Sequence, residues 1–541
     1  MSNSMKSDLP NLPDNQSLSK QQALLLFRQI EKRYQEQEEK YQAKIDYLEE
    51  QLRLLRNELF GRKTEKQVGI DYDQLPLFEP APVPSQPAAA DDEQPIQVAS
   101  HQRKKRGRKP LPEHLPRVDV IHDLSDEQKM CDCGHKMDRI GQQQCEKLDY
   151  IPARVQVLRH IRYKYACKHC EGVSSDGPTV KIAPPPAQLI PKSNATAGLL
   201  AHIFTSKFAD GLPLHRQQKI FARLGLDLSR STMANWAIEA SRRCRPLIDL
   251  LQGEIRSGPL INADESPWLV LQESGRRNTS KSYMWVFCGG DPQRPARIYQ
   301  YHPSRSGQVA ADFIGKDYRG YVQSDAFVGY DRLGQHPGIV RLGCWAHVRR
   351  KFVEVTRVKK KIRSQRKNPK SLADEALEFI GRLYQIEKQA RAQQLAPEQI
   401  AKLRQQMALP VLDQFKSWLE AKKSIVPPKA LLGKAIDYAL SNWPLLIVYV
   451  EDGRLSPDNN AAENAIRPFV LGRKNWLFAG HPRGAEASAT FFSLIETAKA
   501  NDLEPYAYLR YLFEHLPLAQ DDKQYRSLLP QYVDKELIRS A

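Results

Sequence analysis

The chain has 541 residues, and its 81 Lys and Arg residues outnumber its 63 Asp and Glu residues, which gives a formal net charge of +18 at pH 7. A surplus of this size indicates a polyanionic partner, nucleic acid first, and the length allows several domains. No apolar run approaches the ~20 residues of a membrane-spanning helix, and the N-terminus has no apolar segment typical of a secretion signal, so we expect a cytoplasmic protein without a membrane partner.

Residues 18–66 are expected to form a long helix, since apolar side chains recur along it at a spacing of three and four. Glu31 and Glu38 occupy two of the apolar positions, so only the second half has a regular heptad pattern. The pattern favours a short coiled coil that joins copies of the chain into a homo-oligomer. An amphipathic helix packed on its own domain is the alternative.

Residues 67–110 are rich in Pro, Ala, Gln and acidic residues and are predicted to be a disordered linker. The linker ends in a basic arm, in which Arg106, Arg108 and Lys109 are suited to the minor groove of DNA. Most runs of charge are simply solvated, which is the alternative here. Even a solvated arm would bind phosphates in a salt-dependent way.

A small zinc-binding module is predicted over residues 111–182. Two close cysteine pairs lie on either side of a strand-like stretch at 155–165, and such pairs can bring four thiolates to one tetrahedral, structural Zn²⁺. The four expected ligands are Cys131, Cys133, Cys167 and Cys170. The first pair is closer than is usual for zinc, and isolated buried thiols are the alternative.

Residues 190–256 are predicted to be helical throughout. Gly225 separates two helices, and either Ser229 or Ser231 can cap the second. This arrangement indicates a DNA-binding helix-turn-helix or a plain helical hairpin that supports the next domain. In a helix-turn-helix, the residues facing the major groove would be Arg230, Thr232 and Asn235.

Residues 257–352 and 455–500 are predicted to form an α/β core. Three strands, a helix and two further strands are expected at 260–271, 283–288, 297–301, 309–314, 320–330 and 339–345. This order is that of a ribonuclease-H-like fold, in which the first and fourth strands are neighbours. Asp264 lies in the first strand and Asp325 at the tip of the fourth, so we expect the two carboxylates to meet.

A helical insertion is predicted over residues 353–454, because this segment is too long for a loop. Its helices are expected at 372–394, 397–419 and 431–450. The insertion would cover the site or bind DNA, and a helical subdomain without direct contact is the alternative. Residues 501–541 are expected to form a C-terminal helical tail.

A third carboxylate follows the insertion. Ser456 can cap a short helix that Pro468 would end, and Glu463 and Arg467 share one face of it. Taken alone, this is a surface helix with an ordinary Glu–Arg pair. With Asp264 and Asp325, however, Glu463 completes a trio of acids that repel one another and need cations between them.

Two Mg²⁺ or Mn²⁺ ions held by such a trio can activate an attacking oxygen and stabilise a leaving oxygen in phosphodiester transfer. Basic residues expected near Glu463, where they would bind DNA phosphates, are Arg467, Arg473 and Lys474. Three further candidates for the active site are His347, Asp458 and Asn460. For Asp458 a capping role at the helix start is the alternative, and for His347 a packed position in the core.

The sequence resembles the insertion sequence 66 transposase family over nearly its whole length. The resemblance depends on the motifs LFGRKTEK at 59–66, RGRKPLP at 106–112, the cysteine module, ADES at 263–266, SDAFVGY at 324–330, CWAHVRR at 344–350, DNNAAENAIRP at 458–468 and GRKN at 472–475. The chain departs from the family pattern in the close spacing of its first cysteine pair and in Thr64, where a serine is common.

The resemblance implies a DDE transposase with Asp264, Asp325 and Glu463 as metal ligands. It implies binding of the terminal inverted repeats of a bacterial insertion sequence, cleavage at their 3′ ends and joining to target DNA, in the nucleoid of the cytoplasm. It also implies two small companion proteins encoded by the same element. A metal-dependent DNA nuclease and a catalytically inactive DNA-binding protein are the alternatives.

Overall fold

The computed structural model describes most residues between Leu25 and Leu52, and residues 155–166, 180–360 and 371–539. The chain divides into two compact units, one formed by residues 1–61 and 160–541 and the other by residues 62–159. Most of the second unit, the basic arm and the cysteine pairs lie outside the described residues. The predictions for Arg106, Arg108, Lys109, Cys131, Cys133, Cys167 and Cys170 therefore stay predictions.

The described residues of the N-terminal segment are helical, as predicted. Most of their large apolar side chains are exposed, including Phe27, Tyr34 and Leu52, whereas Tyr47 is half-buried. The coiled coil itself stays a prediction.

The prediction of a strand at 155–165 is wrong for most of that range. Residues 155–163 have no regular structure, and only β1 (Lys164–Ala166) pairs with β2 (Val180–Ile182). A strand requires a partner for its N–H and C=O groups, and the described pairing is only three residues long.

Four helices precede the sheet, as expected for residues 190–256. They are α2 (Ala197–Phe208), α3 (Leu214–Arg223), α4 (Arg230–Arg243) and α5 (Arg245–Ser257). Gly225 has a φ of +79° at the turn after α3, a conformation that glycine adopts without strain. Ser229 caps α4 by accepting a hydrogen bond from the N–H of Thr232.

A six-stranded mixed sheet forms the centre of the larger unit. Its strands are β3 (Leu260–Val270), β4 (Lys281–Asp291), β5 (Arg294–His302), β6 (Gly320–Gln323), β7 (Ile339–Leu342) and β8 (Phe478–Ala479). The order is β5-β4-β3-β6-β7, with β8 beside β3. The strands β3, β4 and β5 pair antiparallel, whereas β6 runs parallel to both β3 and β7. The predicted neighbourhood of the first and fourth strands is thus confirmed.

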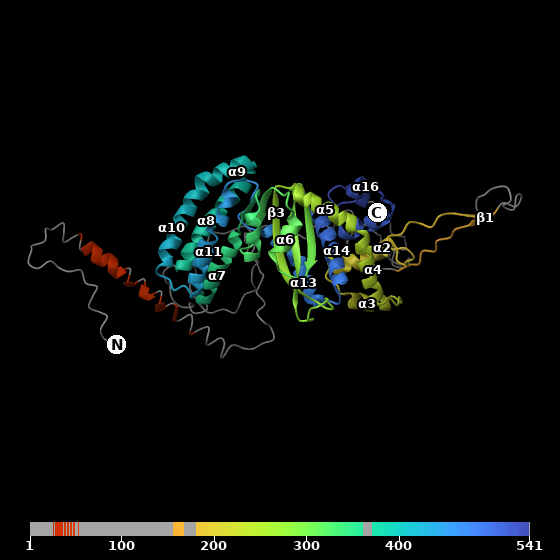
Figure 1. The fold of residues 1–541 in the computed structure, drawn as a ribbon, viewed down its shortest axis with the longest axis horizontal. Coiled ribbons are helices and arrows are strands. Elements are labelled where there is room, and N and C mark those ends of the chain that lie inside the picture. The colour runs from red at the N-terminus through yellow and green to blue at the C-terminus, as the bar shows by residue number, and fades with distance from the viewer. Residues whose placement is uncertain are drawn as a thin grey trace, which may run out of the picture. The chain divides into compact units, whose positions relative to one another are not determined.

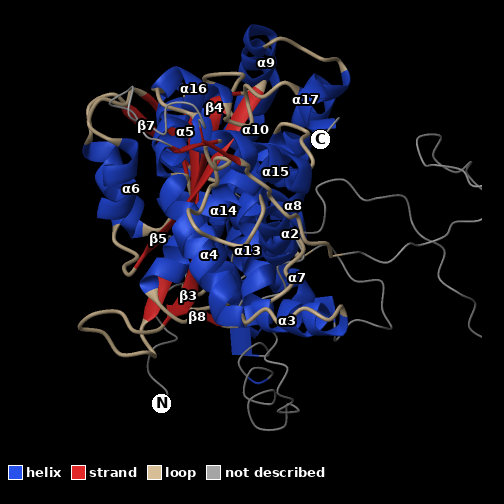
Figure 2. Cartoon of the chain, turned by 90° about the vertical axis from the view of Figure 1, so that its right-hand side faces the viewer, coloured by secondary structure: helices blue, strands red, loops and turns tan. Residues whose placement is uncertain are grey.

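Helices cover both faces of this sheet. Helices α13 (Asn460–Trp476) and α14 (Pro482–Ala500) pack on β3, β4 and β5, and Figure 2 shows them in front of the strands. On the opposite face, Phe313 of α6 (Gly307–Ile314) stacks on Phe287 of β4 with ring centroids 3.7 Å apart. The start of α6 touches η2 (Val328–Gln335), where Gly329 leaves no room for a Cβ on Gly307.

The predicted insertion is helical and has its own hydrophobic core. After α7 (Trp345–Lys360), its elements are α8 (Leu372–Ala392), α9 (Pro397–Leu403), the π-turn η3 (Arg404–Ala408), α10 (Leu409–Lys423), α11 (Leu431–Ser441), α12 (Trp443–Leu446) and η4 (Val448–Val450). Their core includes Trp345, Phe415 and Trp443. Helices α8, α10 and α11 lie on one side of the sheet in Figure 1, and α5, α14 and α4 on the other.

Helix α13 corrects the expectation that Pro468 ends a short helix. The helix begins at Asn460, later than the Ser456 cap would place it, and continues through Pro468 to Trp476. A proline inside a helix costs about 3 kcal/mol. Packing offsets this cost, because Ala465 and Phe469 are fully buried and Phe469 lies edge-on to Trp268 at 5.1 Å.

The C-terminal segment is helical, as predicted, and forms part of the main core. Its elements are α15 (Pro505–His515), η5 (Leu516–Leu518), α16 (Asp522–Ser527) and α17 (Lys535–Arg539). Helix α15 packs on α2, and Phe513 lies edge-on to Phe204. Among the helices that the structure describes, none combines the length and the apolar character needed to cross a membrane.

Candidate active site

Asp264 lies in the middle of β3, on the face of the sheet that α13 and α14 cover. It pairs with Val286, which pairs with Tyr299. Tyr299 donates a hydrogen bond to the carbonyl oxygen of Ala465 in α13, and its N–H donates to Ser493 Oγ in α14. Since cross-strand partners point to the same face, Asp264 also points toward α13.

Asp325 follows β6 directly, and β6 is the parallel neighbour of β3. Its Oδ1 accepts a hydrogen bond of 3.1 Å from the N–H of Phe327, which holds the carboxylate at the strand end. Burial raises the pKa of Asp264 well above its usual value, and the negative charges of Glu265, Glu463 and Asp325 raise it further. The three carboxylates expected from the sequence therefore share one electrostatic environment.

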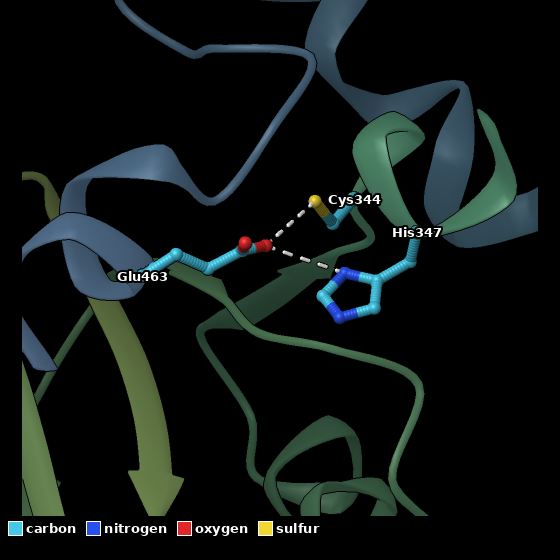
Figure 3. A group of neighbouring side chains, drawn as sticks. All are labelled: Cys344, His347 and Glu463. Atoms are coloured by element: carbon cyan, nitrogen blue, oxygen red, sulfur yellow. Dashed lines mark hydrogen bonds and ion pairs between the residues drawn. The ribbon is translucent and has the colours of Figure 1, made fainter. Parts of the chain in front are cut away.

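Glu463 lies in the first turn of α13 and is 12% exposed. Figure 3 shows its carboxylate facing Cys344 and His347. The Sγ of Cys344 donates to Oε1 of Glu463 at 3.7 Å, and Nδ1 of His347 lies 3.4 Å from the same oxygen. On the other oxygen, Oε2, Glu463 forms an ion pair of 3.3 Å with Arg350.

Cys344 and His347 come from the junction between β7 and α7. The N–H of Trp345 donates to the carbonyl of Pro457, which ties this junction to the segment before α13. Burial lowers the pKa of His347, and although the charge of Glu463 opposes this shift, the ring favours the neutral form. Nδ1 of His347 is buried and has no hydrogen-bond partner. His347 thus lies beside Glu463, and its place in an active site stays a prediction.

A buried network of amide side chains holds these elements together. Asn262 donates to Gln323 Oε1 at 2.9 Å and to Asn459 Oδ1 at 3.0 Å. Asn459 in turn donates to the carbonyl of Ala263 at 2.9 Å, and Gln323 donates to the carbonyls of Gly343 and Ser456. The network joins β3, β6, the end of β7 and the start of α13, which are the elements that present the carboxylates.

We expect Asn459→Ala to destabilise the protein by about 1–3 kcal/mol, because the buried carbonyl of Ala263 and an N–H of Asn262 would lose their partner. Urea unfolding measures this change. Asn464→Ala, at an exposed position of helix α13, which Asn459 precedes, is the matched control and should change stability little. Equal stability of the two variants would contradict a structural role for the network.

On the other face of β3, Glu265 forms a second charged cluster. Arg305 Nη2 lies 2.5 Å from Oε1 of Glu265, and Tyr330 donates to Oε2 at 2.6 Å. Arg305 also lies 3.9 Å from Asp325 and covers the ring of Phe327 at 3.8 Å. Burial raises the pKa of Glu265, whereas its hydrogen bond from Tyr330 and the charge of Arg305 oppose the shift. Arg305 thereby orients the segment that carries Asp325.

Arg305 also borders an open hollow of about 450 Å³. Its lining consists of Arg276, Lys281, Tyr283, Pro303, Ser304 and Arg305. Three cations, of which Arg305 lies beside Asp325, and an aromatic ring line this hollow and form a surface suited to a phosphodiester backbone.

The three basic residues expected near Glu463 lie at different distances from it along α13. Arg473 and Lys474 are in the last turn of α13, about 15 Å along the helix from Glu463 at 1.5 Å per residue. Arg473 there donates to the carbonyl of Pro267. Arg467 is exposed one turn beyond Glu463.

Asp458 is 4% exposed and lies just before the first turn of α13. The hydroxyl of Ser456 donates a hydrogen bond to Oδ1 of Asp458. Burial raises the pKa of Asp458, and a hydrogen bond from the N–H of Asn460 lowers it. Arg230 and Asn235 are exposed on α4. Their expected contacts with DNA stay predictions.

Several residues of the site were not singled out from the sequence. They are Asn262, Glu265, Arg305, Gln323 and Arg350. A partial signal exists, because Asn262 and Gln323 each lie two residues before an expected catalytic aspartate and Arg350 lies in the CWAHVRR motif. For Arg305 the sequence offers no such signal.

Comparison with protein families gives four matches. The model described as "Transposase IS66 family" matches residues 192–487, which include all three carboxylates. The "zinc-finger binding domain of transposase IS66" matches residues 128–171, and the "IS66 C-terminal element" matches residues 493–531. A fourth model, "Transposase C of IS166 homeodomain", matches residues 47–120.

Similar full-length proteins occur in Sinorhizobium fredii. The uncharacterized protein y4jD is 34% identical over 505 residues, covering 90% of this chain and 93% of its own length. The uncharacterized protein y4hP is 31% identical over 484 residues, covering 85% of this chain and 84% of its own length.

Proposed function

Because the chain belongs to the IS66 transposase family, we propose that it cleaves the ends of its insertion sequence at their 3′ ends and joins them to target DNA. The observation that supports this most directly is that the charges of Asp325 and Glu463, which come from two other elements, both act on the buried carboxylate of Asp264. The strand order, with two antiparallel pairs followed by parallel β6 and β7, supports a ribonuclease-H-like core.

The donor set of these three residues suits Mg²⁺ or Mn²⁺, which prefer carboxylate oxygens. Burial and then the charges of neighbouring carboxylates raise the pKa of Asp264, and a bound cation would offset both effects. Two bound ions would supply activation of the attacking oxygen and stabilisation of the leaving oxygen.

The protein's own residues would orient the reacting groups. Asp264 and Asp325 would hold the ions together, with Glu463 as the third ligand. Arg305 keeps the Asp325 segment in place and, with the other cations of the adjoining hollow, would bind the backbone of the strand being cut. The exposed Arg467 would add a phosphate contact beside Glu463.

The remaining modules would bring two DNA ends together. The cysteine module with its structural Zn²⁺, the basic arm and α4 would bind the terminal inverted repeats, and the N-terminal helix would join protomers. Two small companion proteins of the same element would take part, and the work would be done at the nucleoid.

A cleavage and joining assay tests this proposal. Wild type, Glu463→Ala and the control Asn464→Ala are incubated with Mg²⁺ and DNA that carries the element's own ends or scrambled ends. We expect joined products from wild type and Asn464→Ala, only with the true ends, and none from Glu463→Ala.

Three other outcomes would contradict the proposal. Cutting of both DNAs without joining would favour a nuclease. Equal products from Glu463→Ala would remove Glu463 from the site. Tight binding of the ends without any reaction, with the companion proteins present, would indicate an inactive DNA-binding protein.

A further inference from the structure

We propose that Cys344, His347 and Glu463 form a second metal site, for Zn²⁺ or a similarly soft divalent ion, and that its occupancy withdraws Glu463 from the Mg²⁺ ligand set. The existence of this site does not depend on the proposed transposase reaction. Its inhibitory consequence does rest on that proposed function.

The separations of the three donor atoms already approach those of a zinc site. Zn–S bonds of about 2.3 Å and Zn–N and Zn–O bonds of about 2.0 Å in a tetrahedron place S and O about 3.5 Å apart and N and O about 3.3 Å apart. The corresponding distances here are 3.7 Å from Cys344 Sγ to Glu463 Oε1 and 3.4 Å from His347 Nδ1 to the same oxygen. All three donor atoms lie within 4.8 Å of one another.

The surroundings of the donor atoms also suit a bound cation. His347 Nδ1 is buried without a hydrogen-bond partner, and it faces the carboxylate (Figure 3). The N–H of Asn459 points at Cys344 Sγ from 3.2 Å, the kind of outer contact that orients a sulfur ligand. Arg350 pairs with Oε2 of Glu463, whereas Cys344 and His347 face Oε1.

The two sites would compete because they share one carboxylate but differ in chemistry. Asp264, Asp325 and Glu463 offer only oxygen, which Mg²⁺ prefers, whereas Cys344 and His347 add sulfur and nitrogen, which Zn²⁺ prefers and Mg²⁺ does not. A Zn²⁺ ion at Cys344 would therefore hold Glu463 on the α7 side. The enzyme would then lack its third hard ligand.

Zinc counting on the full chain tests the site itself. Wild type, Cys344→Ala and the control Cys244→Ala, which removes another buried free thiol, are equilibrated with buffered Zn²⁺ and analysed for bound metal. We expect Cys344→Ala to bind one Zn²⁺ fewer per chain than both other proteins, because zinc held elsewhere cancels in the difference. His347→Gln, with folding checked by thermal unfolding, should lose the same ion.

A second measurement tests the competition. At constant Mg²⁺, the Zn²⁺ concentration that halves DNA cleavage should rise about tenfold or more in Cys344→Ala relative to Cys244→Ala. Equal zinc counts in all proteins would overturn the site, and this result can be read even if the chain cleaves no DNA. A difference in zinc count with identical inhibition would overturn the shared role of Glu463.

Discussion

Asp264→Asn is expected to reduce DNA cleavage by about 10³-fold and, at the same time, to stabilise the protein in the absence of metal. The loss of activity follows because an amide cannot replace the carboxylate that we propose as the central metal ligand. The gain in stability follows because the carboxylate is buried beside three others, which raises its pKa. Replacing a residue with a purely structural role would instead lower both DNA cleavage and folding stability.

The stability gain has a predictable pH dependence. The folded protein binds the proton of Asp264 more tightly than the unfolded chain, whose carboxyl titrates near 3.8. The contribution of Asp264 to the folding stability of the metal-free wild type therefore falls as pH rises above about 3.8 toward the raised pKa of the folded state. Asp264→Asn lacks this titrating group, so the stability of the variant relative to wild type should increase as the pH rises through this range.

Thermal unfolding with and without Mg²⁺ measures the gain in stability and the loss of metal binding. Mg²⁺ should raise the melting temperature of wild type, since it binds the folded form, and should have a smaller effect on Asp264→Asn. Asp291→Asn, which alters an exposed carboxylate at the end of β4, is the matched control and should behave as wild type. A variant at Asp264 that cleaves DNA normally, or that is destabilised at pH 7 without metal, would contradict the assignment.

Arg404→Met is expected to destabilise the helical insertion by about 3–5 kcal/mol, because it leaves Glu387 buried without its partner. Arg404 is 2% exposed and forms bidentate hydrogen bonds of 2.8 Å with Glu387. It also donates to the carbonyls of Tyr449, Asp452 and Leu455. One guanidinium thus holds the chain where it returns from the insertion to the site.

Unfolding by urea checks this expectation against Arg454→Met. Arg454 also pairs with a carboxylate, Asp452, but is 52% exposed, so its loss should cost less than about 1 kcal/mol. The double variant Arg404→Met with Glu387→Leu should recover part of the stability, because no charge is left buried alone. Recovery should be incomplete, since three carbonyls still lack their donor. Equal effects of the two single variants would contradict this role of Arg404.

The sequence by itself determined the elements and most of the acidic residues of the candidate site. The strand-like stretch at 260–271, bounded by turn residues, predicted the strand that carries Asp264, and the order of strands predicted that β3 and the strand before Asp325 would be neighbours. These patterns are local, because a period of two or of three to four residues reflects which side of a strand or helix is buried. Ser229 likewise caps α4 through its immediate neighbours.

Only the tertiary structure decided what surrounds Glu463. Cys344 contacts it across 119 residues of sequence, and Asn262 reaches Asn459 across 197. The continuation of α13 through Pro468 depends equally on distant residues, since Phe469 gains its burial from Trp268 and the helices around it. Such contacts depend on how the insertion returns the chain to the sheet, and the free energy of that packing outweighs the local preference of proline to end a helix.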